Sequence, residues 1–121
     1  MGRKLRHHIL YIEDILECIK KIKNYIHTMP FEEFSKDSKT IDAIVRNFEI
    51  IGEESKQLPQ KIKDTYPDVE WKTMIDFGNV IIHEYFGISL KIMWDIAKNE
   101  LPSLEQKIAH LLKILPNNKT Q

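Results

Sequence analysis

The chain has one cysteine, four glycines and no long apolar run. Because Cys18 stands alone among 121 residues, no disulfide can form within the chain, and a cysteine-based zinc site is excluded. Lys, Glu or Asp interrupts every apolar stretch well before the ~20 residues that cross a bilayer. The N-terminus also lacks the apolar segment of a secretory signal. We therefore expect a soluble protein in a reducing cytoplasm.

An excess of charge of either sign is missing too. The 18 Lys and Arg residues balance 18 Asp and Glu residues, which gives a formal net charge of zero. No strong global field would attract nucleic acid, so such binding would depend on a local patch. A length of 121 residues is typical of one domain with its own core. We expect a single domain over residues 1–121, with a frayed tail from about residue 116.

What the sequence does contain is apolar residues at helical spacing. Between residues 5 and 29 they recur every three or four positions, with charged residues mostly on the other faces, until Pro30 ends the pattern. The same spacing returns four more times, and no strand alternation is convincing. The fold class predicted is an all-α antiparallel bundle of four or five helices. The expected helices cover residues 5–29, 41–58, 70–85, 90–97 and 104–115, with short turns at 31–34 and 61–65 and a kink at Pro102.

One stretch of the third helix combines polar side chains that can do chemistry. Asn79 and His83 are four residues apart, so on a helix they share one face. Tyr85 would point to roughly the opposite side. The three converge only if the helix unwinds before Gly87 or if a second chain completes the site. This pattern predicts a site at a helix end or at a dimer contact.

Each of these residues also has an ordinary structural interpretation. An isolated helical histidine such as His83 is most often not functional, and Tyr85 beside an apolar neighbour is typical of a core or interface aromatic. Asn79 fits the role of satisfying a buried backbone group equally well. Gly78 within a helix costs roughly 0.5 to 1 kcal/mol relative to alanine, which favours a packing reason, a functional reason or an introduced change.

Several ordered blocks together resemble the HepT-like branch of the HEPN superfamily. They are residues 31–34, 37–52 and 79–87, with Trp71, Trp94 and the Leu101-Pro102 pair. The resemblance covers nearly the whole chain. It implies a homodimeric helical bundle, the toxin of a toxin–antitoxin pair, and a cognate MntA-type nucleotidyltransferase as the antitoxin. It further implies cleavage of RNA without a metal or other cofactor.

The resemblance also implies which residues act. The family motif reads Arg-x4-His-x-Tyr, often with Asn after the arginine, and by position it carries over to Asn79, His83 and Tyr85 as catalytic residues. The imidazole would take the proton of the RNA 2′-hydroxyl, while a guanidinium would stabilise the charge on the phosphate. The motif tyrosine, here Tyr85, would also be the site at which the antitoxin attaches AMP. The arginine is expected at position 78, where this sequence has Gly78.

Loss of such a charge stabiliser typically lowers the rate by about 10² to 10³, so we expect weak or absent cleavage. Arg46, beside Asn47 and Glu49, is a possible auxiliary replacement. Gly78 is either the natural residue or a substitution introduced to reduce RNA cleavage. The alternative function is a non-catalytic dimeric partner or substrate of the nucleotidyltransferase, and a third reading is a helical dimer in which the motif has no role.

Three lysines at positions 20, 21 and 23 form a small basic face in the first helix. We interpret them first as solvated surface and second as a contact for RNA or for the antitoxin.

Overall fold

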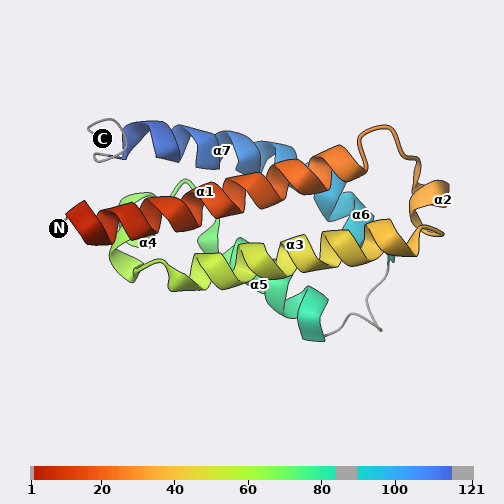
Figure 1. The fold of residues 1–121 in the computed structure, drawn as a ribbon, viewed down its shortest axis with the longest axis horizontal. Coiled ribbons are helices and arrows are strands. Elements are labelled where there is room, and N and C mark those ends of the chain that lie inside the picture. Colours follow the sequence, from red (N-terminus) through yellow and green to blue (C-terminus); the bar gives the residue numbers. More distant parts are fainter. Residues whose placement is uncertain (1, 84–89, 116–121) are drawn as a thin grey trace.

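The computed structural model is a bundle of helices joined by short turns (Figure 1). It describes residues 2–83 and 90–115, with side chains described for residues 7–78 and 90–115. Within these ranges there is no strand, so the predicted all-α class is confirmed. The elements are α1 (Gly2–Tyr25), α2 (Phe31–Phe34), α3 (Ser38–Gln57), α4 (Gln60–Thr65), α5 (Trp71–His83), α6 (Leu90–Asp95), the π-helical turn η1 (Ile96–Glu100) and α7 (Leu101–Ile114).

Helix α1 forms the centre of the bundle. It packs against α3 on one side and against α7 on the other (Figure 1). Its isoleucines at three- and four-residue spacing face inward and are almost completely buried, as the sequence pattern predicts. These are Ile12, Ile15, Ile19 and Ile22, and Ile26 in the turn after the helix is buried as well. Removing this apolar stripe from water supplies much of the driving force for the bundle.

The start of α3 is fixed by a side-chain cap. The backbone N–H of Thr40 donates to Asp37 Oδ1 at 3.0 Å, and the Thr40 hydroxyl donates to Oδ2 at 2.8 Å. These hydrogen bonds hold the pKa of the Asp37 carboxyl below its usual value. Asp37 is thus the N-cap, and Thr40 is its partner within the first turn. The other end of α3 comes just before Pro59, where Leu58 is extended.

The kink expected at Pro102 takes the form of a π-helical turn placed before it. Pro102 has no N–H to donate to the Lys98 carbonyl, so regular α-helical bonding fails at this point. The backbone N–H of Leu101 bonds instead to the Ile96 carbonyl, five residues earlier. The helix therefore widens over Ile96–Glu100 and continues as α7.

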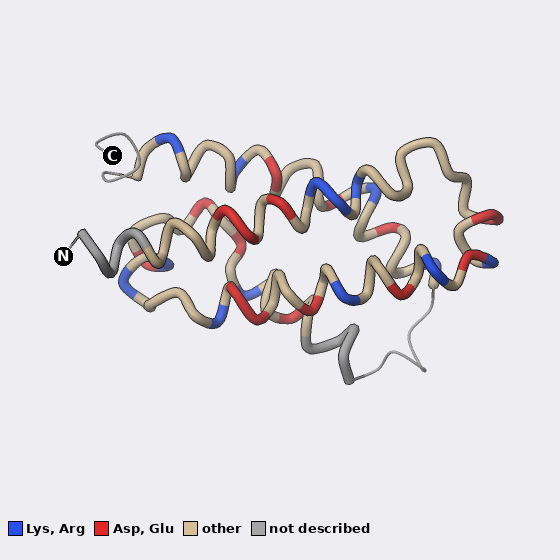
Figure 2. The backbone as a smooth tube through the Cα atoms, in the orientation of Figure 1, with Lys and Arg blue, Asp and Glu red and all other residues tan. Residues whose placement is uncertain are grey.

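Several expectations fall outside the part that the structure describes. These are the unwinding before Gly87 and the tail from residue 116. No described helix has both the length and the apolar character needed to cross a membrane. Figure 2 shows both signs of charge distributed over the bundle, and between residues 13 and 23 of α1 the acidic residues precede the lysines.

Candidate functional site

Helix α5 carries positions 79 and 83, and its first turn is held firmly against the core. The indole N–H of Trp71 donates to the Tyr66 carbonyl at 3.1 Å, while the Trp71 backbone N–H donates to the Val69 carbonyl at 2.9 Å. Trp71 and Met74, one turn apart, are both buried. The helix thus starts from a fixed point, which sets the direction in which its later turns run.

Further along, α5 crosses α3 at a contact between two glycines. A Cβ atom added to Gly78 would lie 3.0 Å from the Gly52 Cα and 3.4 Å from the Phe48 carbonyl oxygen. A Cβ added to Gly52 would likewise lie 3.0 Å from the Gly78 Cα. The rings of Phe48 and Phe77 pack edge to face next to this contact, with centroids 5.9 Å apart. Both glycines are therefore needed for the two backbones to approach this closely.

This contact gives Gly78 a packing role. Position 78 faces α3, so a side chain there would start against the backbone of α3. Positions 79 and 83 are about 100° and 140° further around the helix, on a side turned away from that contact. Position 78, where the resemblance led us to expect an arginine, therefore belongs to the interface between two helices.

Asn79 and His83 both belong to α5, separated by one helical turn. Their side chains lie outside the described residues, as do Tyr85 and Gly87. The convergence of the three motif side chains thus stays a prediction.

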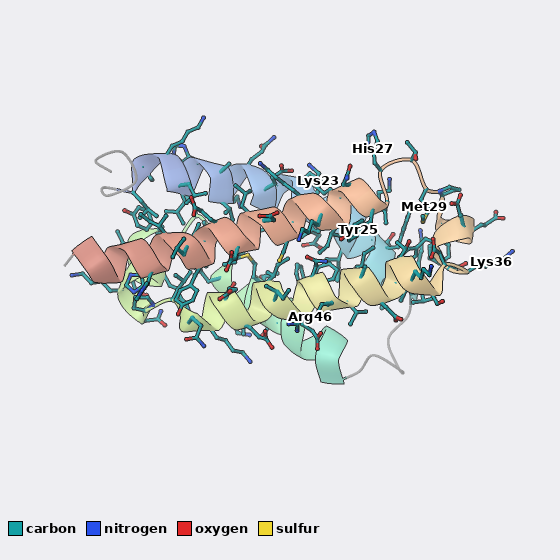
Figure 3. The ribbon with its side chains drawn as sticks, in the orientation of Figure 1. Lys23, Tyr25, His27, Met29, Lys36 and Arg46 are labelled. Atoms are coloured by element: carbon teal, nitrogen blue, oxygen red, sulfur yellow. The ribbon has the colours of Figure 1, made fainter. Side chains whose placement is uncertain are left out.

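Arg46 lies on α3, the helix that packs against α5 (Figure 3). Its side chain is 61% exposed and pairs with the Glu49 carboxylate at 3.6 Å. An exposed ion pair of this kind contributes less than about 1 kcal/mol, so the guanidinium can leave it at low cost. Arg46 is thus available to another anion.

The neighbouring residue, Asn47, is one that sequence reasoning noted only as a polar companion of Arg46. It is buried, and its side-chain amide donates to the Ala43 carbonyl at 2.8 Å. The signal was present in the sequence, since Asn47 is three residues after Ile44 and four before Ile51, within the apolar row of α3.

An acidic pair joins α1 to α3. Burial, a hydrogen bond with Asp14 and the negative charges of Asp14 and Glu53 raise the pKa of Glu54 to about 7.

Burial also raises the pKa of the nearby Cys18 thiol to about 11, which keeps the thiol protonated. A buried, neutral thiol packs in the core as a small apolar side chain does.

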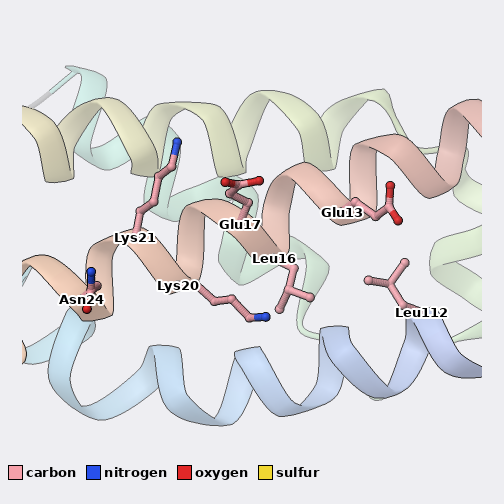
Figure 4. Close-up of a pocket in the computed structure, with 7 residues that line it drawn as sticks. All are labelled: Glu13, Leu16, Glu17, Lys20, Lys21, Asn24 and Leu112. Atoms are coloured by element: carbon pink, nitrogen blue, oxygen red, sulfur yellow. The ribbon is translucent and has the colours of Figure 1, made fainter.

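The lysines of the basic face predicted on α1 extend in different directions. In Figure 4, Lys20 extends from α1 towards α7, whereas Lys21 extends towards α3. Both nevertheless line one hollow of about 750 Å³, together with Leu16 and Leu112. Lys23 turns to the α7 side, where it forms an ion pair with Glu105.

The described residues contain no cluster of three or more His, Cys, Asp or Glu side chains that could hold a metal ion.

Comparison with known proteins identifies the family. Residues 15–111 match the family described as ribonuclease HepT-like. A candidate RNase of Methanocaldococcus jannaschii, MJ0127, is 42% identical over 103 residues, covering 85% of each chain. A protein of Thermococcus cleftensis named as a probable ribonuclease HepT is 39% identical over 108 residues, covering 89% of this chain and 98% of that one. No solved structure gives a significant match. The chain belongs to the ribonuclease HepT-like family.

Proposed function

We propose that this protein is the toxin of a toxin–antitoxin pair and a metal-independent endoribonuclease of low activity, with His83 as its base. The observation that carries the proposal is membership of a ribonuclease family over residues 15–111, a range that includes all of α5 and the motif positions 79, 83 and 85. The placement of Asn79 and His83 one turn apart on α5 supports a shared surface for an amide and an imidazole.

In this mechanism the His83 imidazole accepts the proton of a ribose 2′-hydroxyl. The 2′-oxygen attacks the adjacent phosphorus as the bond to the 5′-oxygen breaks, and the imidazolium returns its proton, directly or through water, to the departing 5′-oxygen. One fragment then ends in a 2′,3′-cyclic phosphate and the other in a 5′-hydroxyl. Asn79 orients the imidazole, and Tyr85 completes the edge of the site. The substrate is single-stranded or looped RNA, where the 2′-hydroxyl can align with the phosphate.

The proposed site lacks the cation that the family motif is expected to supply. Because position 78 lies against the backbone of Gly52, an arginine there would have to displace α3. Arg46, exposed and loosely paired, is the candidate for stabilising the charge on the phosphate. Without an effective replacement, cleavage falls by about 10² to 10³ relative to an enzyme that has the cation.

The test is an RNA-cleavage assay with purified protein in the presence of a metal chelator. We expect slow formation of 2′,3′-cyclic phosphate ends that disappears in His83→Ala and decreases in Arg46→Gln. His110→Ala, which changes an exposed histidine on α7, is the matched control and should cleave normally. Cleavage that survives His83→Ala would refute the proposed mechanism.

The contact between Gly78 and Gly52 also favours a second function of a different class. If no cation reaches the site, the protein is a non-catalytic dimer that serves as partner and substrate of an MntA-type nucleotidyltransferase, with Tyr85 as the residue that receives AMP. Incubation with that enzyme and ATP, followed by mass spectrometry of the intact protein and of Tyr85→Phe, tests this function. AMP on the first protein and none on the second, with no RNA cleavage, would establish the partner role.

A further inference from the structure

We propose that the groove between the end of α1 and the η1–α7 segment binds the phosphate backbone of RNA. We call this surface the basic groove and define it by Lys20, Lys23, His27 and Lys98. The proposal deepens the proposed function, from which it takes RNA as the ligand, but it concerns a surface away from the motif. Because α7 packs on α1 while α5 packs on α3, the basic groove and positions 79 and 83 lie on different sides of the bundle (Figure 1).

The groove consists of two adjoining hollows, of about 280 and 100 Å³. Lys23 and His27 line both of them, so the two form one continuous depression. Lys20 lines the first hollow and also the larger hollow of Figure 4, but Glu13 and Glu17 line that one too, so it is not part of the basic groove. Two adjoining hollows at the end of α1 suit a chain-like ligand better than a compact one.

On the α1 side, two lysines and a histidine follow one another along the groove. Lys20 and Lys23 are three residues apart on α1, so they project from one side about one turn, or 5.4 Å, apart, and His27 lies in the turn just after the helix. Figure 3 shows Lys23 and His27 at the end of α1 that leads to α2. Lysine charges one turn apart, with an imidazole beyond them, suit contacts with successive phosphates of a nucleic-acid backbone.

The opposite wall is provided by Lys98, which belongs to the π-helical turn η1. Its ammonium group lies 5.1 Å from the centre of the Trp94 ring, in a cation–π contact that holds it near the second hollow. The π-helical turn arises from Pro102, and such turns occur frequently at functional sites. The position of Lys98 is therefore set by the fold.

The charge of the groove is positive in a protein with no net charge. Among the described residues, three lysines and one histidine line the two hollows, against the single carboxylate of Glu105. Glu105 pairs with Lys23, so it offsets one of the three lysine charges. This is the kind of local patch that a neutral protein needs in order to bind a polyanion.

The experiment measures binding separately from cleavage. The probe is a short fluorescent oligouridine with methylated 2′-hydroxyls, which the proposed mechanism cannot cut, and its affinity is followed by fluorescence anisotropy. We expect Lys20→Gln/Lys98→Gln to weaken binding about fivefold to tenfold at low salt. The control Lys36→Gln/Lys61→Gln removes the same charge from exposed lysines elsewhere and should bind normally. Circular dichroism of both variants checks that the helices are retained.

Salt dependence gives a second readout. Between about 50 and 200 mM salt, each lost contact with a single-stranded phosphate lowers the slope of log affinity against log salt by about 0.7. The double variant should therefore lose about 1.4 from the slope, while the control keeps it. Glu105→Gln provides a gain of function, since it removes the negative charge in the groove and should tighten binding severalfold. Damage to the fold would not produce that increase.

The outcomes separate the two proposals. Equal affinity of the groove variant and its control, or no tightening in Glu105→Gln, would overturn the basic groove while leaving the RNase mechanism intact. Groove-dependent binding without any cleavage would refute the RNase mechanism and leave the groove. Binding of polyglutamate, with the same dependence on the groove and no binding of the oligonucleotide, would identify an acidic protein as the ligand and would also overturn the RNA proposal.

Discussion

Replacing Gly78 by alanine tests the contact on which the interpretation of the site depends. The added methyl group would meet the Gly52 Cα at 3.0 Å and the Phe48 carbonyl oxygen at 3.4 Å. Both are backbone atoms, so neither can turn aside in the way that the end of a side chain can. The two helices would have to move apart by a few tenths of an ångström, and the neighbouring packing of Phe48 against Phe77 would loosen.

Two opposing terms set the change in unfolding free energy of Gly78→Ala. Alanine is about 1 kcal/mol more favourable than glycine within a helix, whereas forcing an extra carbon into a packed contact costs about 1 to 3 kcal/mol. We expect the packing term to prevail because backbone is contacted on both sides. The net loss should be about 1 kcal/mol of unfolding free energy, which for a domain of this size lowers Tm by about 4 °C.

The assay is a double-mutant cycle of Gly78→Ala, Gly52→Ala and the two together, measured by urea and thermal unfolding. Each single change should destabilise the protein. In the double variant the helices have already separated, so the second methyl group should cost less than it does alone. The reasoning is refuted if each single variant gains the ~1 kcal/mol expected from helix propensity alone. The larger change Gly78→Arg should separate α3 from α5 still further, so we do not expect it to restore RNA cleavage.

Two further predictions concern stability. The pKa of Glu54 is raised from 4.5 to about 7, so its contribution to stability is present below pH 4.5 and is lost as the pH rises through 7. Glu54→Gln should therefore flatten the decrease in unfolding free energy between pH 5 and 8. The control Glu53→Gln should largely keep that decrease. Ser55 is fully buried, and its hydroxyl has no hydrogen-bond partner among the described residues, so Ser55→Ala should raise the unfolding free energy by about 1 kcal/mol in urea titrations. The exposed Ser103→Ala should leave the free energy unchanged.

Much of the fold could be predicted from local patterns. Apolar spacing identified the helices because one face of each must be buried, and Pro59 marked the end of α3 because proline cannot continue the bonding of a preceding helix. The end predicted at Pro30 was wrong, since α1 already ends at Tyr25 and a turn follows it. The residues at which helices begin were harder to predict. The helix predicted from residue 41 begins at Ser38, since Asp37 and Thr40 form a cap within the polar segment that separates two apolar patterns.

The site was predictable only in part. Helical spacing placed Asn79 and His83 on one helix, but the role of Gly78 depends on Gly52, which belongs to another helix and shows no local pattern linking the two. The same holds for the lysines of α1. Lys20 and Lys21 are adjacent in sequence, and only the positions of α3 and α7 on either side of α1 show that their side chains extend towards different helices.

Together, the proposed function and the proposed groove assign binding and chemistry to different surfaces. Gly78 packs against α3 at the position where the family motif is expected to have an arginine, whereas Lys20 and Lys98 lie on the α1–α7 side of the bundle. Charge that contacts phosphates outside the reacting bond lowers the free energy of the bound RNA and of the transition state equally, so it strengthens binding without raising the rate of the bound complex. Groove variants should therefore change KM and leave kcat unaltered, while Arg46→Gln should lower kcat if its guanidinium reaches the reacting phosphate.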